Sequence, residues 1–149
     1  MRASFVLLVV ILLVSCRDKA GTGPVEIHYG EDVCERCKMI ISEKNFAAQY
    51  LLPRRESRKF DDLGCLVEHF RENENEITNL AAVYVVDFNS GGWTDGKKAF
   101  YLRSGDVNTP MGYGIIAFGD RESLLAYPGF EKGRELGGFG ELIGQGGHR

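Results

Sequence analysis

The 149-residue chain lacks an excess of positive charge, a long apolar run and the common catalytic motifs. Its formal net charge is −3, so no basic field indicates a nucleic-acid partner. Its longest apolar run, Phe5–Val14, is shorter than the roughly 20 residues that a helix needs to cross a membrane. The sequence contains no Gly-x-Ser-x-Gly elbow, no His-Glu-x-x-His pair and no P-loop. We therefore expect a protein that is not an enzyme and has no nucleic-acid partner.

The N-terminus is typical of an exported bacterial protein. Arg2 precedes the apolar run, which ends in Leu13-Val14-Ser15-Cys16. That ending resembles the lipobox, in which the cysteine is acylated and becomes the new N-terminus; an ordinary cleaved signal with a chance cysteine is the alternative. We expect a signal peptide over residues 1–15 and an acylated (palmitate-bearing) Cys16 followed by a tether, residues 16–24. Because Arg17 rather than Asp follows Cys16, the analogy favours a cell-membrane lipoprotein of the outer membrane that faces the periplasm.

Hydropathy patterning predicts an α+β domain over residues 25–136. Alternating or β-branched runs predict strands at Val25–Tyr29, Met39–Ser42, Phe46–Leu52, Ala81–Phe88, Ala99–Leu102 and Gly114–Phe118, and helical periodicity predicts helices after Asp61 and at Arg121–Tyr127. A shift of 58 residues aligns Phe60 with Phe118 and Asp62 with Asp120, which is compatible with two small β-β-α units packed together. The glycine-rich segment 137–149 is expected to be a mostly disordered tail.

Two cysteines and a methionine lie within six residues, in Cys34-x-x-Cys37-x-Met39. The chain has only four cysteines, too few for a disulfide scaffold of this size. A Cys-x-x-Cys pair can turn both sulfurs toward one metal ion, and a neighbouring thioether favours the soft ion Cu(I). Attachment of a c-type haem is excluded because Lys38, not histidine, follows Cys37. A disulfide of an exported protein, a thiol–disulfide redox pair and a core role for Met39 remain as alternatives.

The segment from Cys34 to Asp62 resembles the signature of the NosL family. These proteins are periplasmic copper-binding lipoproteins that assist assembly of the copper centres of nitrous oxide reductase. The resemblance is carried by the Cys-x-x-Cys-x-Met motif, Phe46-Ala47-Ala48-Gln49, Phe60-Asp61-Asp62, Val86-Asp87-Phe88, Trp93 and Met111-Gly112-Tyr113-Gly114. It implies two small α+β units, one Cu(I) held by sulfur ligands with a histidine, and delivery to a cuproenzyme or copper-transfer assembly machinery. Lys38 departs from the pattern, because the family favours glycine there.

Carried over to this sequence, the resemblance ranks Cys37 and Met39 first among the metal ligands, with Cys34 next. His28, six residues before Cys34, can reach the same loop, although a surface position on its strand is equally compatible with the sequence. Met111 lies in the Pro-Met-Gly-Tyr-Gly loop and is a ligand candidate or a core residue.

Other polar residues are assigned to structure. Cys65 and His69 fall on the predicted helix, and Cys65 is expected to be a small buried hydrophobe. Asp61, Asp62 and Glu68 are expected on a solvated helix face, where the dipole favours them. The sequence thus predicts a Cu(I) metallochaperone, with nitrous oxide reductase maturation as the expected role. An exported redox protein using the two loop cysteines, or a metal-sequestering tether protein, is the alternative.

Overall fold

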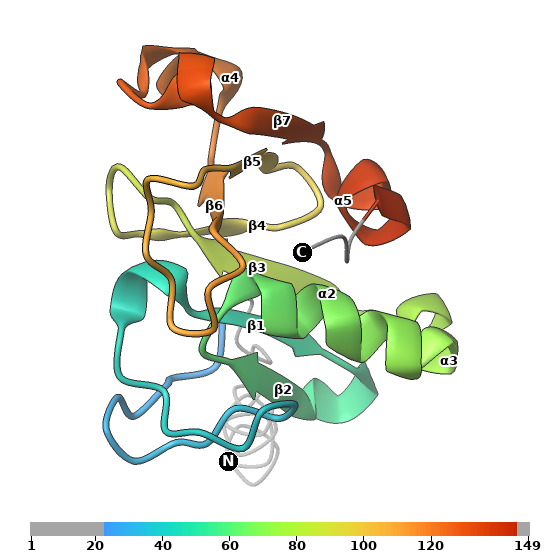
Figure 1. The fold of residues 1–149 in the computed structure, drawn as a ribbon. Helices are drawn as coiled ribbons and strands as arrows, with labels where there is room; N and C mark the ends of the chain where they lie inside the picture. Colours follow the sequence, from blue (N-terminus) through green and yellow to red (C-terminus); the bar gives the residue numbers. More distant parts are fainter. Residues whose placement is uncertain (1–22, 146–149) are drawn as a thin grey trace, which may run out of the picture.

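Two small antiparallel sheets organise the chain in the computed structural model, which describes residues 23–145 (Figure 1). The predicted signal peptide, the predicted acylation site Cys16 and most of the predicted tether lie outside the described residues. Between residues 23 and 145, no helix is both long and apolar enough to cross a membrane.

The first sheet has the strand order β2-β1-β3-β4 and carries the larger core. Its strands are β1 (Ala48–Leu51), β2 (Ser57–Phe60), β3 (Ala82–Val86) and β4 (Trp93–Asp95), with the short helix η2 (Lys44–Phe46) before β1 and η3 (Pro53–Arg55) between β1 and β2. Helices α2 (Leu63–Glu72) and α3 (Glu74–Thr78) follow β2. The apolar face of α2 contributes Leu66, Val67 and Phe70 to the same core as Tyr50 and Phe60. The beginning of α2 is thereby fixed against the end of β2.

The second sheet has the strand order β6-β5-β7. It comprises β5 (Phe100–Arg103), β6 (Ile115–Phe118) and β7 (Arg134–Gly137), accompanied by α4 (Arg121–Ala126), η4 (Phe130–Lys132) and α5 (Phe139–Gln145). Phe46, Leu102, Ile116, Phe118 and Leu124 form a smaller core there. The prediction of an α+β fold is confirmed, and both of the small sheets are antiparallel.

The two aspartates aligned by the 58-residue shift have the same structural role. The Asp62 carboxylate accepts a hydrogen bond from the backbone N–H of Gly64 at the start of α2, and Asp120 accepts one from Ser123 at the start of α4. Each aspartate caps a helix that follows an antiparallel strand, since Asp side chains satisfy otherwise unpaired N–H groups at helix starts. The repeat therefore marks two equivalent strand-to-helix junctions.

Two of the predicted strands are wrong. Residues 25–29 belong to no sheet, because Val25 exchanges its backbone N–H and C=O hydrogen bonds with the side-chain amide of Gln49 instead of with another strand. The predicted strand Met39–Ser42 is reduced to a single bridge between Ile40 and Val33. The chain over these residues forms loops that lie against the first sheet.

The prediction of a disordered tail is wrong for residues 137–145. Gly137 has a φ of +75°, a left-handed conformation that glycine adopts readily, and it ends β7 before α5 begins at Phe139. The Glu141 carboxylate accepts a hydrogen bond from Gly138 N–H at 2.9 Å, and Leu142 is fully buried in the larger core. A few apolar residues between glycines are enough to dock this helix. Residues 146–149 lie outside the described part of the chain.

Candidate metal centre

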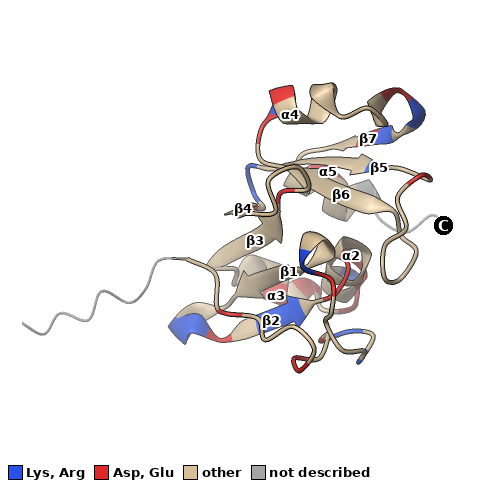
Figure 2. Cartoon of the chain, turned by 90° about the vertical axis from the view of Figure 1, so that its left-hand side faces the viewer, with Lys and Arg blue, Asp and Glu red and all other residues tan. Residues whose placement is uncertain are grey.

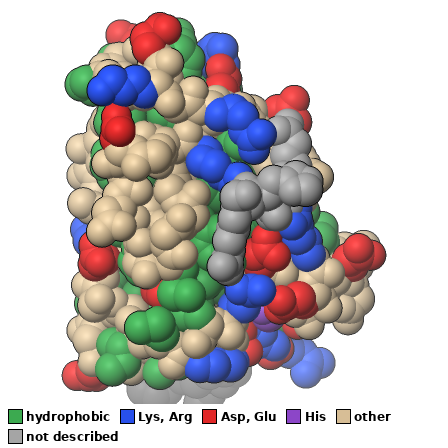
Figure 3. Space-filling view, viewed as in Figure 1, with side chains coloured by type: hydrophobic (Ala, Val, Ile, Leu, Met, Phe, Trp, Pro, Cys, Tyr) green, Lys and Arg blue, Asp and Glu red, His purple; other side chains and the backbone are tan. Residues whose placement is uncertain are grey.

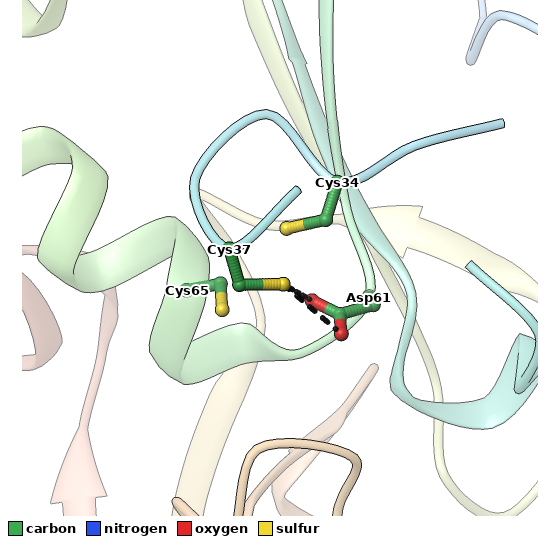
Figure 4. Close-up of side chains that lie close together, drawn as sticks. All are labelled: Cys34, Cys37, Asp61 and Cys65. Atoms are coloured by element: carbon green, nitrogen blue, oxygen red, sulfur yellow. Dashed lines mark hydrogen bonds between the residues drawn. The ribbon is translucent and has the colours of Figure 1, made fainter. Parts of the chain in front are cut away.

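Three free thiols and one carboxylate meet beside the N-terminus of α2 (Figure 4). Cys34 and Cys37 come from the loop before η2, Asp61 directly follows β2, and Cys65 lies in the first turn of α2. The three sulfurs and a carboxylate oxygen all lie within 4.8 Å of one another. We call these four residues the cysteine cluster. Its ligand atoms are close enough together to hold one metal ion.

A tight turn brings the two loop cysteines together. The Cys34 N–H donates to the Met39 carbonyl at 2.8 Å, and the Lys38 N–H donates to the Cys34 carbonyl at 3.1 Å. Lys38 has a φ of +62°, in the left-handed region where a side chain is strained. This geometry gives a physical reason for glycine at that position in the family pattern. The Glu35 N–H also donates to the Lys59 carbonyl, which attaches the turn to β2.

The strand-to-helix junction supplies the other two members of the cluster. Asp61 and Asp62 are both buried, so the expectation of a solvated acidic face is wrong for them. Asp62 has a structural role: besides capping α2, it accepts hydrogen bonds from the Thr109 hydroxyl at 2.6 Å and the Met111 N–H at 2.9 Å. It thereby holds the 104–114 loop over the start of α2. Asp61 instead faces the thiols, and Cys37 Sγ lies 3.4 Å from each of its carboxylate oxygens.

A second set of contacts closes the site from outside. The Tyr113 ring packs on Gly64 so tightly that a Cβ there would lie 1.9 Å from the ring. Arg36, between the two loop cysteines, donates to the Tyr113 hydroxyl at 3.3 Å and forms an ion pair with Glu72 at 2.8 Å. Arg36 thus joins the cysteine loop to the 104–114 loop and to the C-terminal end of α2.

The three thiols have different proton affinities. A hydrogen bond from Cys65, assisted by the backbone N–H groups of Asp61 and Cys37, lowers the pKa of Cys34 to about 6. Burial is the main reason that the pKa of Cys37 is raised to about 11. The pKa of Cys65 is raised because its proton is shared with Cys34 and because it is buried. Because only deprotonated thiols bind a metal ion strongly, metal binding at this cluster releases the protons that the thiols still carry.

Of the five predicted ligands, the cysteine cluster contains Cys34 and Cys37. His28 is not in the cluster; its side chain is 59% exposed and lies 3.8 Å from a carboxylate oxygen of Asp32. Met111 packs against the larger core, and its backbone N–H donates a hydrogen bond to Asp62 at the junction. His69, expected to be structural, is buried and shares a 2.8 Å hydrogen bond with the Tyr50 hydroxyl.

Met39 lies at the surface beside the cluster. Its side chain is 57% exposed, and its neighbours Val33 and Ile40 are 50% and 56% exposed. Hydrophobic side chains gather on the lower left of the face in Figure 3, the region where Figure 1 places this loop. Met39 is two residues from Cys37 in the chain, and its exposure places it at the surface of the cysteine loop.

Sequence reasoning missed Cys65 and Asp61 as members of the cluster. Cys65 was assigned to the core, and it is indeed fully buried, but its sulfur is within 4.8 Å of the other ligand atoms. The signal was available in the spacing. It is limited to short range: only two residues lie between β2, which ends next to Asp61, and α2, which carries Cys65, and the spacing does not show that the thiol loop packs there.

The arrangement suits metal binding better than disulfide exchange. A redox pair needs an accessible cysteine of low pKa as nucleophile. Here the low-pKa thiol, Cys34, is fully buried, whereas the partly exposed Cys37 has a raised pKa. The dipole of α2 adds partial positive charge next to Cys65, which favours an anionic, thiolate-rich site.

Comparisons with known proteins agree with this geometry. The NosL family model matches residues 24–144. The fold is similar to that in the crystal structure of the copper chaperone NosL from Shewanella denitrificans, with a TM-score of 0.56 and 16% sequence identity. The similarity covers 68% of this chain and 83% of that chain. A search of the curated proteins finds no match.

Proposed function

Because this chain belongs to the NosL family, we propose that it is a copper chaperone that binds one Cu(I) ion at the cysteine cluster and passes it to a copper protein. The observation that carries this proposal is the convergence of three free thiols within 4.8 Å, beside a partly exposed loop. The similarity in fold to the Shewanella protein, which is a copper chaperone, supports it.

The donor chemistry favours Cu(I) over Zn(II). Thiolates are soft ligands, and Cu(I) is soft and tolerates low coordination, whereas Zn(II) prefers four ligands in a tetrahedron. We assign Cys34, Cys37 and Cys65 as the copper ligands and Met39 as a candidate for a fourth. Asp61 acts differently: its carboxylate accepts a hydrogen bond from the Cys37 thiol and keeps that thiol oriented until copper arrives.

Transfer uses the difference in exposure among the three thiols. Cys34 and Cys65 are fully buried and hold the ion from inside, while Cys37 is partly exposed. A ligand of the recipient protein can attack copper from the Cys37 side, where the exposed side chains of Met39, Val33 and Ile40 offer an apolar contact surface. Copper is then exchanged between two proteins without passing through water.

The recipient favoured by the sequence resemblance is nitrous oxide reductase or its assembly machinery. We propose further that the protein is acylated at Cys16 and faces the periplasm from the outer membrane. Both proposals rest on the sequence motifs. Deleting the gene should lower the copper content of purified nitrous oxide reductase, and the parent chain should restore it while Cys37→Ser should not. Restoration by Cys37→Ser would contradict the assigned recipient route.

Anaerobic competition with a Cu(I) chelator tests the binding site. Cys34→Ser and Cys37→Ser should each weaken Cu(I) binding about a hundredfold, because serine stays protonated and supplies no thiolate. His28→Ala is the control and should bind as the parent does. Asp61→Asn separates the two metals: Cu(I) affinity should fall less than about tenfold, and Zn(II) affinity should fall more because zinc uses the carboxylate. Parent-like Cu(I) binding by Cys37→Ser would place the site elsewhere.

Disulfide reductase activity tests the alternative function. The purified protein should not reduce insulin, and thiol trapping of the copper-loaded chain should find Cys34 and Cys37 reduced. Sustained reductase turnover would favour the redox interpretation over copper transfer.

A further inference from the structure

The turn between β1 and β2 places two arginines at the surface in a strained conformation. Arg54 and Arg55 are exposed and have φ values of +63° and +62°. This left-handed region suits glycine and strains other residues. In the described part of the chain, neither arginine forms an ion pair, whereas nearby Arg58 pairs with Glu56 at 2.7 Å. An exposed turn that retains two unpaired arginines at conformational cost points to a use for their charge.

This arginine turn, Pro53–Arg55, lies where the described chain begins. The Arg55 guanidinium donates a hydrogen bond to the Gly23 carbonyl at 3.4 Å. Figure 2 shows the blue turn on the same side as the first described residues. Seven residue steps separate Gly23 from Cys16, which span about 25 Å at most. An acyl anchor on Cys16 would therefore keep the turn within that distance of the membrane surface.

We propose that the arginine turn docks on the phosphate headgroups of anionic phospholipids and sets the orientation of the domain on the membrane. The proposal rests on the lipid anchor proposed above. Guanidinium groups pair well with phosphate oxygens, and each arginine near an anionic surface favours the docked state about fivefold. Two arginines then favour it about thirtyfold.

The docked orientation directs the cysteine cluster away from the membrane. Strand β2 begins at Ser57, next to the arginine turn, and ends at Phe60, next to Asp61 of the cluster. The six residue steps from Arg55 to Asp61 cover about 20 Å in extended chain. One hairpin thus carries the membrane contact at one end and the metal site at the other, so that copper is presented toward soluble partners.

Hydrogen exchange on vesicles tests this orientation. The full chain, purified from membranes, is reconstituted into vesicles of phosphatidylcholine with or without anionic phosphatidylglycerol. Amide exchange over residues 52–57 is expected to be about threefold slower on the anionic vesicles, and about 0.5 M NaCl should abolish the difference by screening. Arg54→Gln/Arg55→Gln should exchange equally fast on both vesicles, and Arg54→Lys/Arg55→Lys should retain most of the protection.

The matched control is Lys97→Gln/Lys98→Gln, which removes the same charge from an exposed turn between β4 and β5. It should behave as the parent does. Two results would overturn the proposal: equal exchange of the parent on both vesicles, or protection that survives Arg54→Gln/Arg55→Gln. Equal exchange would indicate that the arginine turn binds an acidic protein and not the membrane. Sedimentation in about 1 M NaCl and the N-terminal mass test the anchor separately, and chelator competition tests copper binding. Failure of the arginine turn is thereby distinguished from failure of the proposed function.

Discussion

Replacing Cys65 by serine tests the residue that the structure adds to the sequence-based ligand set. The side chain is fully buried and its sulfur belongs to the group within 4.8 Å. Serine has nearly the same shape and can still donate a hydrogen bond to Cys34, so the metal-free fold should lose less than about 1 kcal/mol. Serine provides no thiolate at neutral pH. Four-ligand zinc sites bind with about 10–16 kcal/mol, so one ligand accounts for about 2.5–4 kcal/mol, or about two to three orders of magnitude in affinity.

The assay is anaerobic competition with a Cu(I) chelator at fixed pH, with thermal unfolding of the metal-free protein measured alongside. Met111→Leu is the matched control. It removes a thioether sulfur from the neighbouring 104–114 loop, keeps a side chain of similar size, and should leave copper affinity unchanged. Cys65→Ser with parent-like copper affinity and parent-like stability would refute the three-thiol site. A loss of affinity accompanied by unfolding would be detected in the melting curve, and Cys65→Ala would then show whether the thiolate or the packing is required.

Three further predictions concern the fold, the anchor and the thiols. Gly64→Ala should lower the unfolding free energy by about 1–3 kcal/mol in thermal melts, because the new Cβ meets the Tyr113 ring; a higher melting temperature would show that the loop yields. Cys16→Ser should remove palmitate label from the protein, and retained label would contradict the lipobox assignment. Because the pKa of Cys34 is lowered from 9.0 to about 6, the folded metal-free protein binds fewer protons between these values, so urea resistance should rise with pH there, and Cys34→Ser should flatten that rise. Cys37, with its pKa raised to about 11, and Cys65, whose pKa is also raised, should reverse the trend above pH 9, and a monotonic rise would contradict their protonated state.

Much of the fold was predictable because local chemistry determines it. The apolar runs ending at Phe60 and Phe118, each followed by a capping aspartate, identified both strand-to-helix junctions. The predicted strand at residues 25–29 failed because alternation cannot show whether a partner strand is available, and here the Gln49 side chain takes that place. The disordered tail failed for residues 137–145 because glycine content masked Leu142, which is buried only through tertiary packing.

Only the part of the metal centre that is formed by residues close together in the sequence was predictable. The Cys34-x-x-Cys37 turn is visible in the sequence, since its spacing alone brings two sulfurs together. Cys65 lies 28 positions after Cys37, and nothing in its own neighbourhood distinguishes a ligand from a buried core cysteine. Its role depends on the packing of α2 against the loop. Asp61 was misjudged for a related reason: burial beside the thiols, not position at a helix start, determines what its carboxylate contacts.

X-ray absorption spectroscopy of the chain loaded with Cu(I) tests the central claim most directly. Copper bound by Cys34, Cys37 and Cys65 predicts one ion per chain and a first shell dominated by three sulfur atoms. Met39→Leu should leave those three in place if the thioether is only an accessory ligand, and Cys65→Ser should remove one. A first shell dominated by nitrogen or oxygen, or a sulfur count that Cys65→Ser does not change, would contradict the account.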